Sequence, residues 1–110
     1  MPEERDGFEA VASEGDIKEG GLLGVEVNGQ AVVLVKQDGQ VYAIGGTCTH
    51  MGGRLAQGAL EGGTLRCPVH RGGFDIRTGE ALVPPPRRPE PVHDVKMEDG
   101  RIWVSRKPRG

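Results

Sequence analysis

The sequence predicts an all-β fold, and three observations support this. Glycine and proline are abundant, with 19 and 8 among 110 residues, which favours short strands and tight turns over long helices. Apolar runs in the N-terminal half are joined by turn signals typical of β-hairpins. Near the C-terminus, apolar and polar residues alternate as they do in half-buried strands. A chain of this length is expected to form one domain with a modest core.

The N-terminal half predicts a meander of three strands. We expect these strands at 22–27, 30–35 and 40–44. Asn28-Gly29 between the first two is the strongest short hairpin signal, since both turn positions need a positive φ. Residues 36–39 are expected to turn the chain into the third strand. Together the three strands would form the base of a sheet.

The remaining strands are predicted at the two ends of the chain. Residues 92–97 and 101–105 are expected to flank a turn at 98–100 and form a second hairpin. Residues 8–11 are expected to add a strand near the N-terminus, and residues 14–21 to form a loop.

A glycine-rich insertion, about residues 45–86, contains the residues with the clearest chemistry. It holds both cysteines and two of the three histidines, in Cys48-Thr49-His50 and Cys67-Pro68-Val69-His70. Short strands are expected at 64–66 and 73–76, with a turn at 77–80, so that each motif lies on a loop after a strand. Two such loops can present two thiolates and two imidazoles to one site, and this donor set binds soft or borderline metals.

The spacing Cys-x-His followed by Cys-x-x-His resembles the signature of Rieske proteins. The resemblance runs from about Leu22 to Ser105 and includes residues 74–79 and the proline-rich stretch near Pro84. It implies a Rieske-like fold, an antiparallel β sandwich or barrel with a small cluster-binding subdomain inserted at about 45–86. It also implies that residues 1–110 form a single Rieske [2Fe-2S] domain.

The resemblance implies one [2Fe-2S] cluster in the chain and names its ligands. In the family, both cysteines bind one iron and both histidines bind the other. We carry these roles to Cys48, Cys67, His50 and His70, and we assign no catalytic residue.

The resemblance also predicts a low reduction potential. High-potential members have two further cysteines joined in a disulfide, and a serine and a tyrosine whose hydroxyls donate hydrogen bonds to sulfur. The corresponding positions here are Gly53, Val69, Gly72 and Phe74. Because such hydrogen bonds stabilise the reduced cluster, their loss lowers the potential. The residue after the second histidine is Arg71, where the family commonly has glycine; it would oppose protonation of His70, dock an acidic partner or face solvent.

The function implied is that of a stand-alone ferredoxin. Such a carrier passes single electrons from an NAD(P)H-dependent flavoprotein reductase to a terminal oxygenase. A Rieske oxygenase needs a second iron site with two histidines and a carboxylate, and only His93 is left over, so the chain is not expected to be catalytic alone. An alternative function that uses the same cluster is that of a small Rieske subunit of a nitrite reductase or another flavoprotein complex.

Other uses of the cysteines and histidines remain open on the residues alone. A structural zinc-binding module would use the same four ligands, although zinc sites usually space paired ligands by two or more residues. A single disulfide is disfavoured because each cysteine lies beside a histidine. A Cys-His nucleophile would leave the second pair unexplained. His93 is expected to be an ordinary surface or half-buried residue.

Composition limits the partners and the compartment. The net charge of -2 gives no electrostatic reason to expect nucleic acid or an anionic membrane as a partner. No apolar run approaches the ~20 residues that span a bilayer, and the acidic N-terminus lacks a signal-peptide pattern. We expect a soluble, cytoplasmic monomer whose basic tail is solvated. Phe8, Tyr42 and Trp103 are expected to fill the core.

Overall fold

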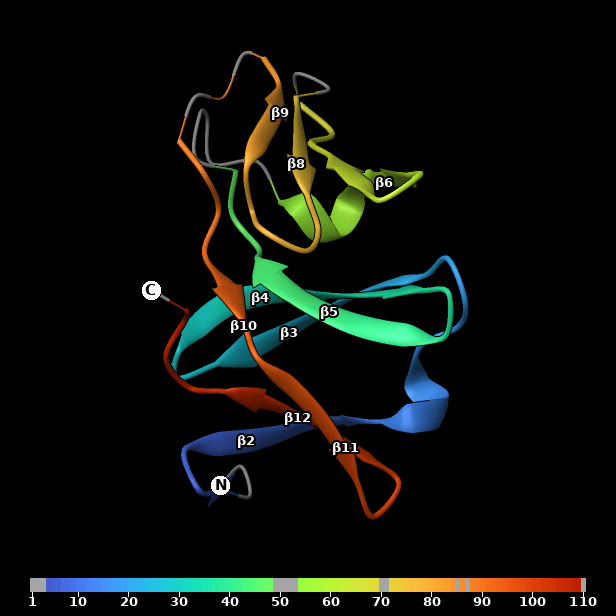
Figure 1. Ribbon diagram of the computed structural model, residues 1–110, viewed down its shortest axis with the longest axis vertical. Helices are drawn as coiled ribbons and strands as arrows, with labels where there is room; N and C mark the ends of the chain where they lie inside the picture. Colours follow the sequence, from blue (N-terminus) through green and yellow to red (C-terminus); the bar gives the residue numbers. More distant parts are fainter. Residues whose placement is uncertain (1–3, 49–53, 70–71, 85, 87, 110) are drawn as a thin grey trace.

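The strands pair antiparallel in three four-stranded sheets, which confirms the all-β prediction. The computed structural model describes residues 4–48, 54–69, 72–84, 86 and 88–109. The sheet orders are β1-β2-β12-β11, β10-β5-β4-β3 and β6-β7-β8-β9. Figure 1 shows the first two sheets in the lower part of the molecule and the third above them.

The strand bounds are β1 Glu4–Arg5, β2 Phe8–Ser13, β3 Leu22–Val27, β4 Gln30–Gln37, β5 Gln40–Gly45, β6 Ala59–Glu61, β7 Thr64–Arg66, β8 Gly73–Asp75, β9 Ala81–Val83, β10 Val92–His93, β11 Val95–Glu98 and β12 Arg101–Ser105. Two short 3₁₀ helices are also present, η1 at Glu14–Asp16 and η2 at Leu55–Gln57. Among the described residues, no helix is long and apolar enough to cross a membrane.

Strand β4 is buried on both faces and joins the two cores of the molecule. Val32 and Leu34 pack with Ile102 and Val104 of β12 in the core of the lower sandwich. The alternate residue Val33 packs in a second core with residues of the upper sheet. Successive side chains of a strand point to opposite faces, so the apolar run of β4 serves both cores.

The hairpin turns follow the sequence signals. Asn28 and Gly29 have φ of 50° and 78°, as the predicted two-residue turn requires. The turn predicted at 36–39 is shorter, because residues 36 and 37 extend β4 and pair with β5. Only Asp38 and Gly39 make this turn, with φ of 54° and 77°. Their backbone N–H groups, that of Gly39 foremost, donate to Glu19 and lower its pKa.

The predicted strand at 92–97 is wrong in one respect, since it is two strands in different sheets. Val92–His93 pairs with β5, whereas Val95–Glu98 pairs with β12. The chain crosses between the sheets at Asp94. The crossing buries Val92 in the upper core and packs Val95 against the lower one. A local alternation pattern cannot reveal which sheet each half joins.

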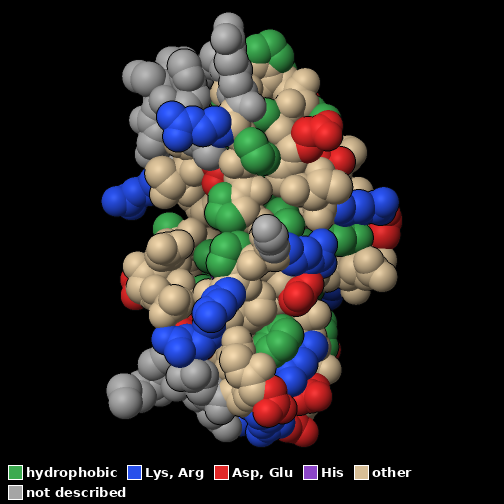
Figure 2. All heavy atoms as spheres, turned by 60° about the vertical axis from the view of Figure 1, so that its left-hand side comes forward, with side chains coloured by type: hydrophobic (Ala, Val, Ile, Leu, Met, Phe, Trp, Pro, Cys, Tyr) green, Lys and Arg blue, Asp and Glu red, His purple; other side chains and the backbone are tan. Residues whose placement is uncertain are grey.

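His93 and the C-terminal tail also differ from the expectation. His93 is 5% exposed, and its Nδ1–H donates to the carbonyl of Ser105 at 2.8 Å. The tail is tied to the sandwich rather than simply solvated. Arg106 Nε lies 3.0 Å from Glu9 Oε1, and Arg109 Nε lies 2.6 Å from Asp94 Oδ1. On the face shown in Figure 2, basic and acidic side chains lie interspersed over the sandwich.

The three aromatic residues expected in the core are buried to different degrees. Trp103 is fully buried, and its Nε1–H donates to the carbonyl of Glu98 at 3.2 Å. Phe8 and Tyr42 are half-buried.

Replacing Arg106 with alanine is expected to lower the free energy of unfolding by ~1–3 kcal/mol. The Glu9 side chain is only 5% exposed and would lose its guanidinium partner. Arg109→Ala is the matched control, because Arg109 and Asp94 are both more than half exposed and such pairs contribute less than ~1 kcal/mol. Urea denaturation of the holoprotein measures both. Equal decreases in the free energy of unfolding of the two variants would show that burial of Glu9 does not strengthen its ion pair with Arg106.

Candidate metal centre

Both cysteines lie shortly after core strands and are buried in the same core. Cys48 follows β5 by three positions, and Cys67 comes immediately after β7. Their exposed fractions are 3% and 1%. They belong to one core cluster, whose buried members also include Val33, Val35, Ile44, Leu55, Leu65, Phe74, Ile76 and Val92. No disulfide joins them. For the two cysteines, the prediction that each motif lies on a loop after a strand is confirmed.

Each cysteine lies at the base of a loop that backbone contacts close. Thr47 and Arg54 form an antiparallel bridge around the first loop, and the N–H of Leu55 donates to the carbonyl of Gly46 at 3.0 Å. In the second loop, the N–H of Cys67 donates to the carbonyl of Gly72 at 2.7 Å. These backbone contacts therefore fix the position of each cysteine at the start of its loop.

The two predicted histidine ligands are not among the residues that the structure describes. His50 and Gly53 belong to residues 49–53, and His70 and Arg71 to residues 70–71, which lie outside the described residues. Within the described part of the chain, no three His, Cys, Asp or Glu side chains gather as a metal site. The described residues thus supply two of the four predicted donors.

The end of η2 packs closely against β7, next to Cys67. Leu55 of η2 is fully buried in the core that holds both cysteines. A Cβ atom on Gly58, at the end of η2, would clash with the carbonyl oxygen of Arg66. Only glycine allows η2 to approach β7 this closely. Sequence reasoning did not single out Gly58, because nothing local distinguishes it from turn glycines.

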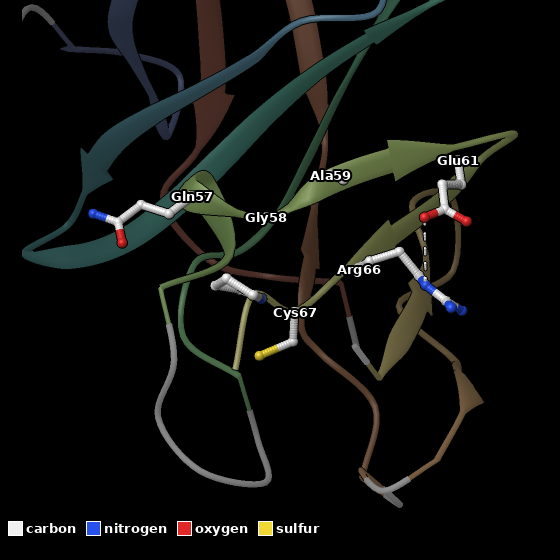
Figure 3. A pocket seen from close by; sticks show the side chains of 7 residues that line it. Gln57, Gly58, Ala59, Glu61, Arg66 and Cys67 are labelled. Atoms are coloured by element: carbon white, nitrogen blue, oxygen red, sulfur yellow. Dashed lines mark ion pairs between the residues drawn. The ribbon is translucent and has the colours of Figure 1, made fainter. Parts of the chain in front are cut away.

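A hollow of about 240 Å³ lies beside Cys67 at this junction. It is lined by Gln57, Gly58, Ala59, Glu61, Arg66, Cys67 and Pro68. Figure 3 shows the side chains of Arg66 and Cys67 pointing apart, with Arg66 directed toward Glu61. Arg66 Nε lies 3.7 Å from Glu61 Oε2. The charged pair therefore stays at the rim, while the thiol points away from it.

Asp75 braces the turn after β8. Its Oδ1 accepts hydrogen bonds from the backbone N–H groups of Arg77 at 2.7 Å and Thr78 at 3.3 Å. This is the side-chain-to-backbone pattern typical of aspartate in turns. Asp75 therefore has a structural role next to the cysteine core.

The positions linked to the reduction potential are partly described. Gly72 and Phe74 are buried, and Val69 is 54% exposed. None of these three residues carries a hydroxyl or thiol that could donate to a cluster sulfur. Gly53 lies outside the described residues.

A buried pair of cysteines on two closed loops fits a metal group bound by thiolates. Comparison with known families decides which group it is. The family model of the Rieske [2Fe-2S] domain matches residues 7–102. The chain belongs to the Rieske [2Fe-2S] family.

Curated and solved relatives agree with this Rieske assignment. The chain is 42% identical over 97 residues to the ferredoxin component of the naphthalene 1,2-dioxygenase system of Pseudomonas putida, covering 88% of this chain and 92% of that protein. The ferredoxin of carbazole 1,9a-dioxygenase from Nocardioides aromaticivorans IC177 superposes with a TM-score of 0.86 at 32% identity, covering 89% of this chain and 96% of that one. A chain from a complex of reduced oxygenase and oxidized ferredoxin in carbazole 1,9a-dioxygenase gives a TM-score of 0.88 at 27% identity, covering 96% and 98%.

These relatives confirm the predicted class of protein. The chain is a Rieske ferredoxin that carries a [2Fe-2S] cluster and transfers electrons, and it is not catalytic alone. A zinc module and a Cys-His nucleophile are excluded by the same family assignment.

The reduction potential of this Rieske ferredoxin is expected near the low end of the ~-150 to +300 mV range of Rieske centres. Neither Gly72 nor Phe74 has a hydroxyl to stabilise the reduced cluster. Redox titration of the holoprotein near neutral pH measures it. A midpoint potential well above zero would contradict the inference that the residues at positions 72 and 74 lower the potential.

Proposed function

We propose that Cys48 and Cys67 bind one iron of the cluster, and that His50 and His70 bind the other. Support comes from the burial of both thiols in one core and from the closure of their two loops. Each histidine follows its cysteine by two or three positions, within the reach of the same loop. The segment 45–86 would then be the cluster-binding subdomain of a single domain spanning residues 1–110.

The bound cluster supplies a site that takes up and releases one electron. The protein's part is to hold this site rigidly and shield one side of it. The apolar cluster around Cys48 and Cys67 excludes water from the thiolate side. Two neutral imidazoles in place of two thiolates make the centre less negative than that of an all-cysteine ferredoxin, which raises its potential relative to that class.

The physiological role we propose is transfer of electrons from an NAD(P)H-dependent flavoprotein reductase to a terminal oxygenase. The observation that carries this proposal is the similarity to proteins named as dioxygenase ferredoxin components. The chain is 42% identical to one of them and covers 92% of its length. The solved complex of a ferredoxin with its oxygenase supports the same partner class.

The surface beside the second loop suits a transient partner. Val69 is 54% exposed directly before the proposed ligand His70, and an exposed apolar side chain near a redox centre gives a partner a contact that excludes water. We propose that the protein acts as a cytoplasmic monomer that docks through this loop surface.

Substituting the proposed ligands is expected to abolish the Rieske centre. Cys48→Ser and Cys67→Ser should lose most iron and sulfide, while His50→Ala and His70→Ala should lose the characteristic visible spectrum. His93→Asn is the control, because His93 lies outside the proposed site and asparagine can keep the hydrogen bond to Ser105. Iron and sulfide content per chain, with the visible spectrum, measures the outcome. A His50 or His70 variant with an unchanged spectrum would refute the ligand set.

The carrier role predicts that the holoprotein couples a reductase to an oxygenase in turnover. NADH-dependent product formation by a dioxygenase of the naphthalene type should require this protein and rise with its concentration. The Cys67→Ser variant should not support it. Copurification of a stoichiometric flavoprotein that does not dissociate would instead identify a permanent subunit.

A further inference from the structure

Charge is distributed unevenly between the two ends of the molecule. Residues 46–91, which connect β5 to β10 and include the upper sheet, contain six arginines and four acidic residues. The rest of the chain contains eight lysines and arginines and twelve acidic residues. With histidine neutral, the formal charge is therefore +2 in residues 46–91 and -4 in the rest. The oxidised cluster leaves this difference unchanged, because two ferric ions, two sulfides and two thiolates together carry no net charge.

The cations in residues 46–91 are all of one kind. The four lysines of the chain lie outside this part, so each of its six cations is an arginine. A guanidinium can donate two parallel hydrogen bonds to one carboxylate, and it is more weakly hydrated than an ammonium group. Arginine is accordingly enriched in protein interfaces, whereas lysine is depleted. The composition of this part therefore favours contact with carboxylates of another protein.

Two of these arginines have partners within the molecule, and a third faces outward. Arg66 Nε lies 3.7 Å from Glu61 Oε2. The guanidinium of Arg77 lies over the ring of Tyr42, 5.9 Å from its centroid. Arg54 is exposed and forms no ion pair with any residue that the structure describes. Its guanidinium is therefore open to a carboxylate from outside the chain.

The fold holds Arg54 beside the core that contains both cysteines. Its backbone bridges to Thr47 across the base of the first loop. The next residue, Leu55, is fully buried in the same core as Cys48 and Cys67. The backbone of Arg54 is thus fixed by the contacts that close the loop, while its side chain remains at the surface. A partner that contacts Arg54 comes close to the proposed cluster site.

A hollow of about 410 Å³ lies next to Arg54, between η2 and the edge of the sandwich. Its lining includes Val25 of the edge strand β3, Val33 of β4 and Ala56 of η2, together with Arg54 and Gln57. Figure 1 shows η2, in light green, between the upper sheet and the sandwich. Protein interfaces combine apolar contacts at the centre with polar groups at the rim. This hollow can receive the aliphatic part of an acidic side chain while its carboxylate meets the guanidinium.

We propose that Arg54 and the hollow beside it form a docking site for an acidic segment of the terminal oxygenase. The proposal rests on the proposed function as an electron carrier and names the chemistry of the partner's surface. The oxygenase is the partner, because a chain that superposes on this one comes from a solved complex of an oxygenase with a ferredoxin. An acidic docking surface would also repel the acidic sandwich, so the charge difference would orient the carrier as it approaches.

Charge reversal at residue 54 in the holoprotein tests this site. Arg54→Glu should lower the second-order rate constant for oxidation of the reduced carrier by a naphthalene-type oxygenase about tenfold at low ionic strength. The difference should shrink as salt screens the charges, and Arg54→Lys, which keeps the charge, should retain most of the rate. Lys18→Glu is the matched control, because it makes the same charge change at an exposed residue of the sandwich. Stopped-flow spectroscopy measures these rates.

A second variant places a negative charge in the same hollow. Gln57→Glu adds a carboxylate to an exposed residue of the lining and should also slow the reaction. It decides the matter if Arg54→Glu does not hold its cluster. In both variants the midpoint potential, the EPR spectrum and the rate at saturating oxygenase should match those of the parent protein, because the site acts on docking alone.

Three outcomes would contradict these expectations. Equal effects of Arg54→Glu and Lys18→Glu would overturn the docking site, since they would reflect net charge alone. Slower reduction by the reductase, with unchanged oxidation by the oxygenase, would overturn it by assigning the site to another partner. A parent protein that transfers no electrons to the oxygenase would refute the proposed function itself, and the docking site with it.

Discussion

Backbone closure of the two loops after β5 and β7 is the constraint on which the rest of the site depends. The Thr47 to Arg54 bridge and the hydrogen bond from Cys67 to Gly72 define the base of each loop. Both bases lie on strands whose apolar residues are fixed in one core. The positions of the two thiols thus follow from main-chain geometry, which varies less than side-chain conformation does.

The sandwich contributes to this site through β4. This strand presents Val33 and Val35 to the core that contains both cysteines, and Val32 and Leu34 to the core of the sandwich. A displacement of the upper sheet would therefore disturb packing that the lower sheets also need. Protein interiors are densely packed and transmit such strain. A carrier that must exchange electrons without rearranging benefits from this rigidity, because little energy is spent on reorganisation.

Local signals predicted much of the fold. Strands β3, β7 and β12 have the bounds expected from the sequence, and the turn at Asn28-Gly29 adopts the predicted positive φ values. The crossing at Asp94 was missed, because it depends on which core each neighbouring residue enters. Strands β6 and β9 and helix η2 were also missed, since segments of three residues are too short to carry a clear pattern.

The sequence predicted which residue types form the candidate site, but not the packing contacts that hold its loops in place. The two Cys/His motifs identify the donors because their spacing is local and specific. The glycines that matter most, Gly58 and Gly72, contact residues far from them in the sequence, Arg66 and Pro86. Sequence reasoning could treat such glycines only as turn residues or as neighbours of the cluster.

We propose that two cysteines and two histidines from two closed loops hold one [2Fe-2S] cluster. Pulsed EPR of the reduced protein is the sharpest test of these ligands, because it detects the nitrogen nuclei bound to iron. We expect couplings from two imidazole nitrogens and an average g-value below that of all-cysteine clusters. A spectrum without nitrogen coupling, with the average g-value of an all-cysteine ferredoxin, would contradict it.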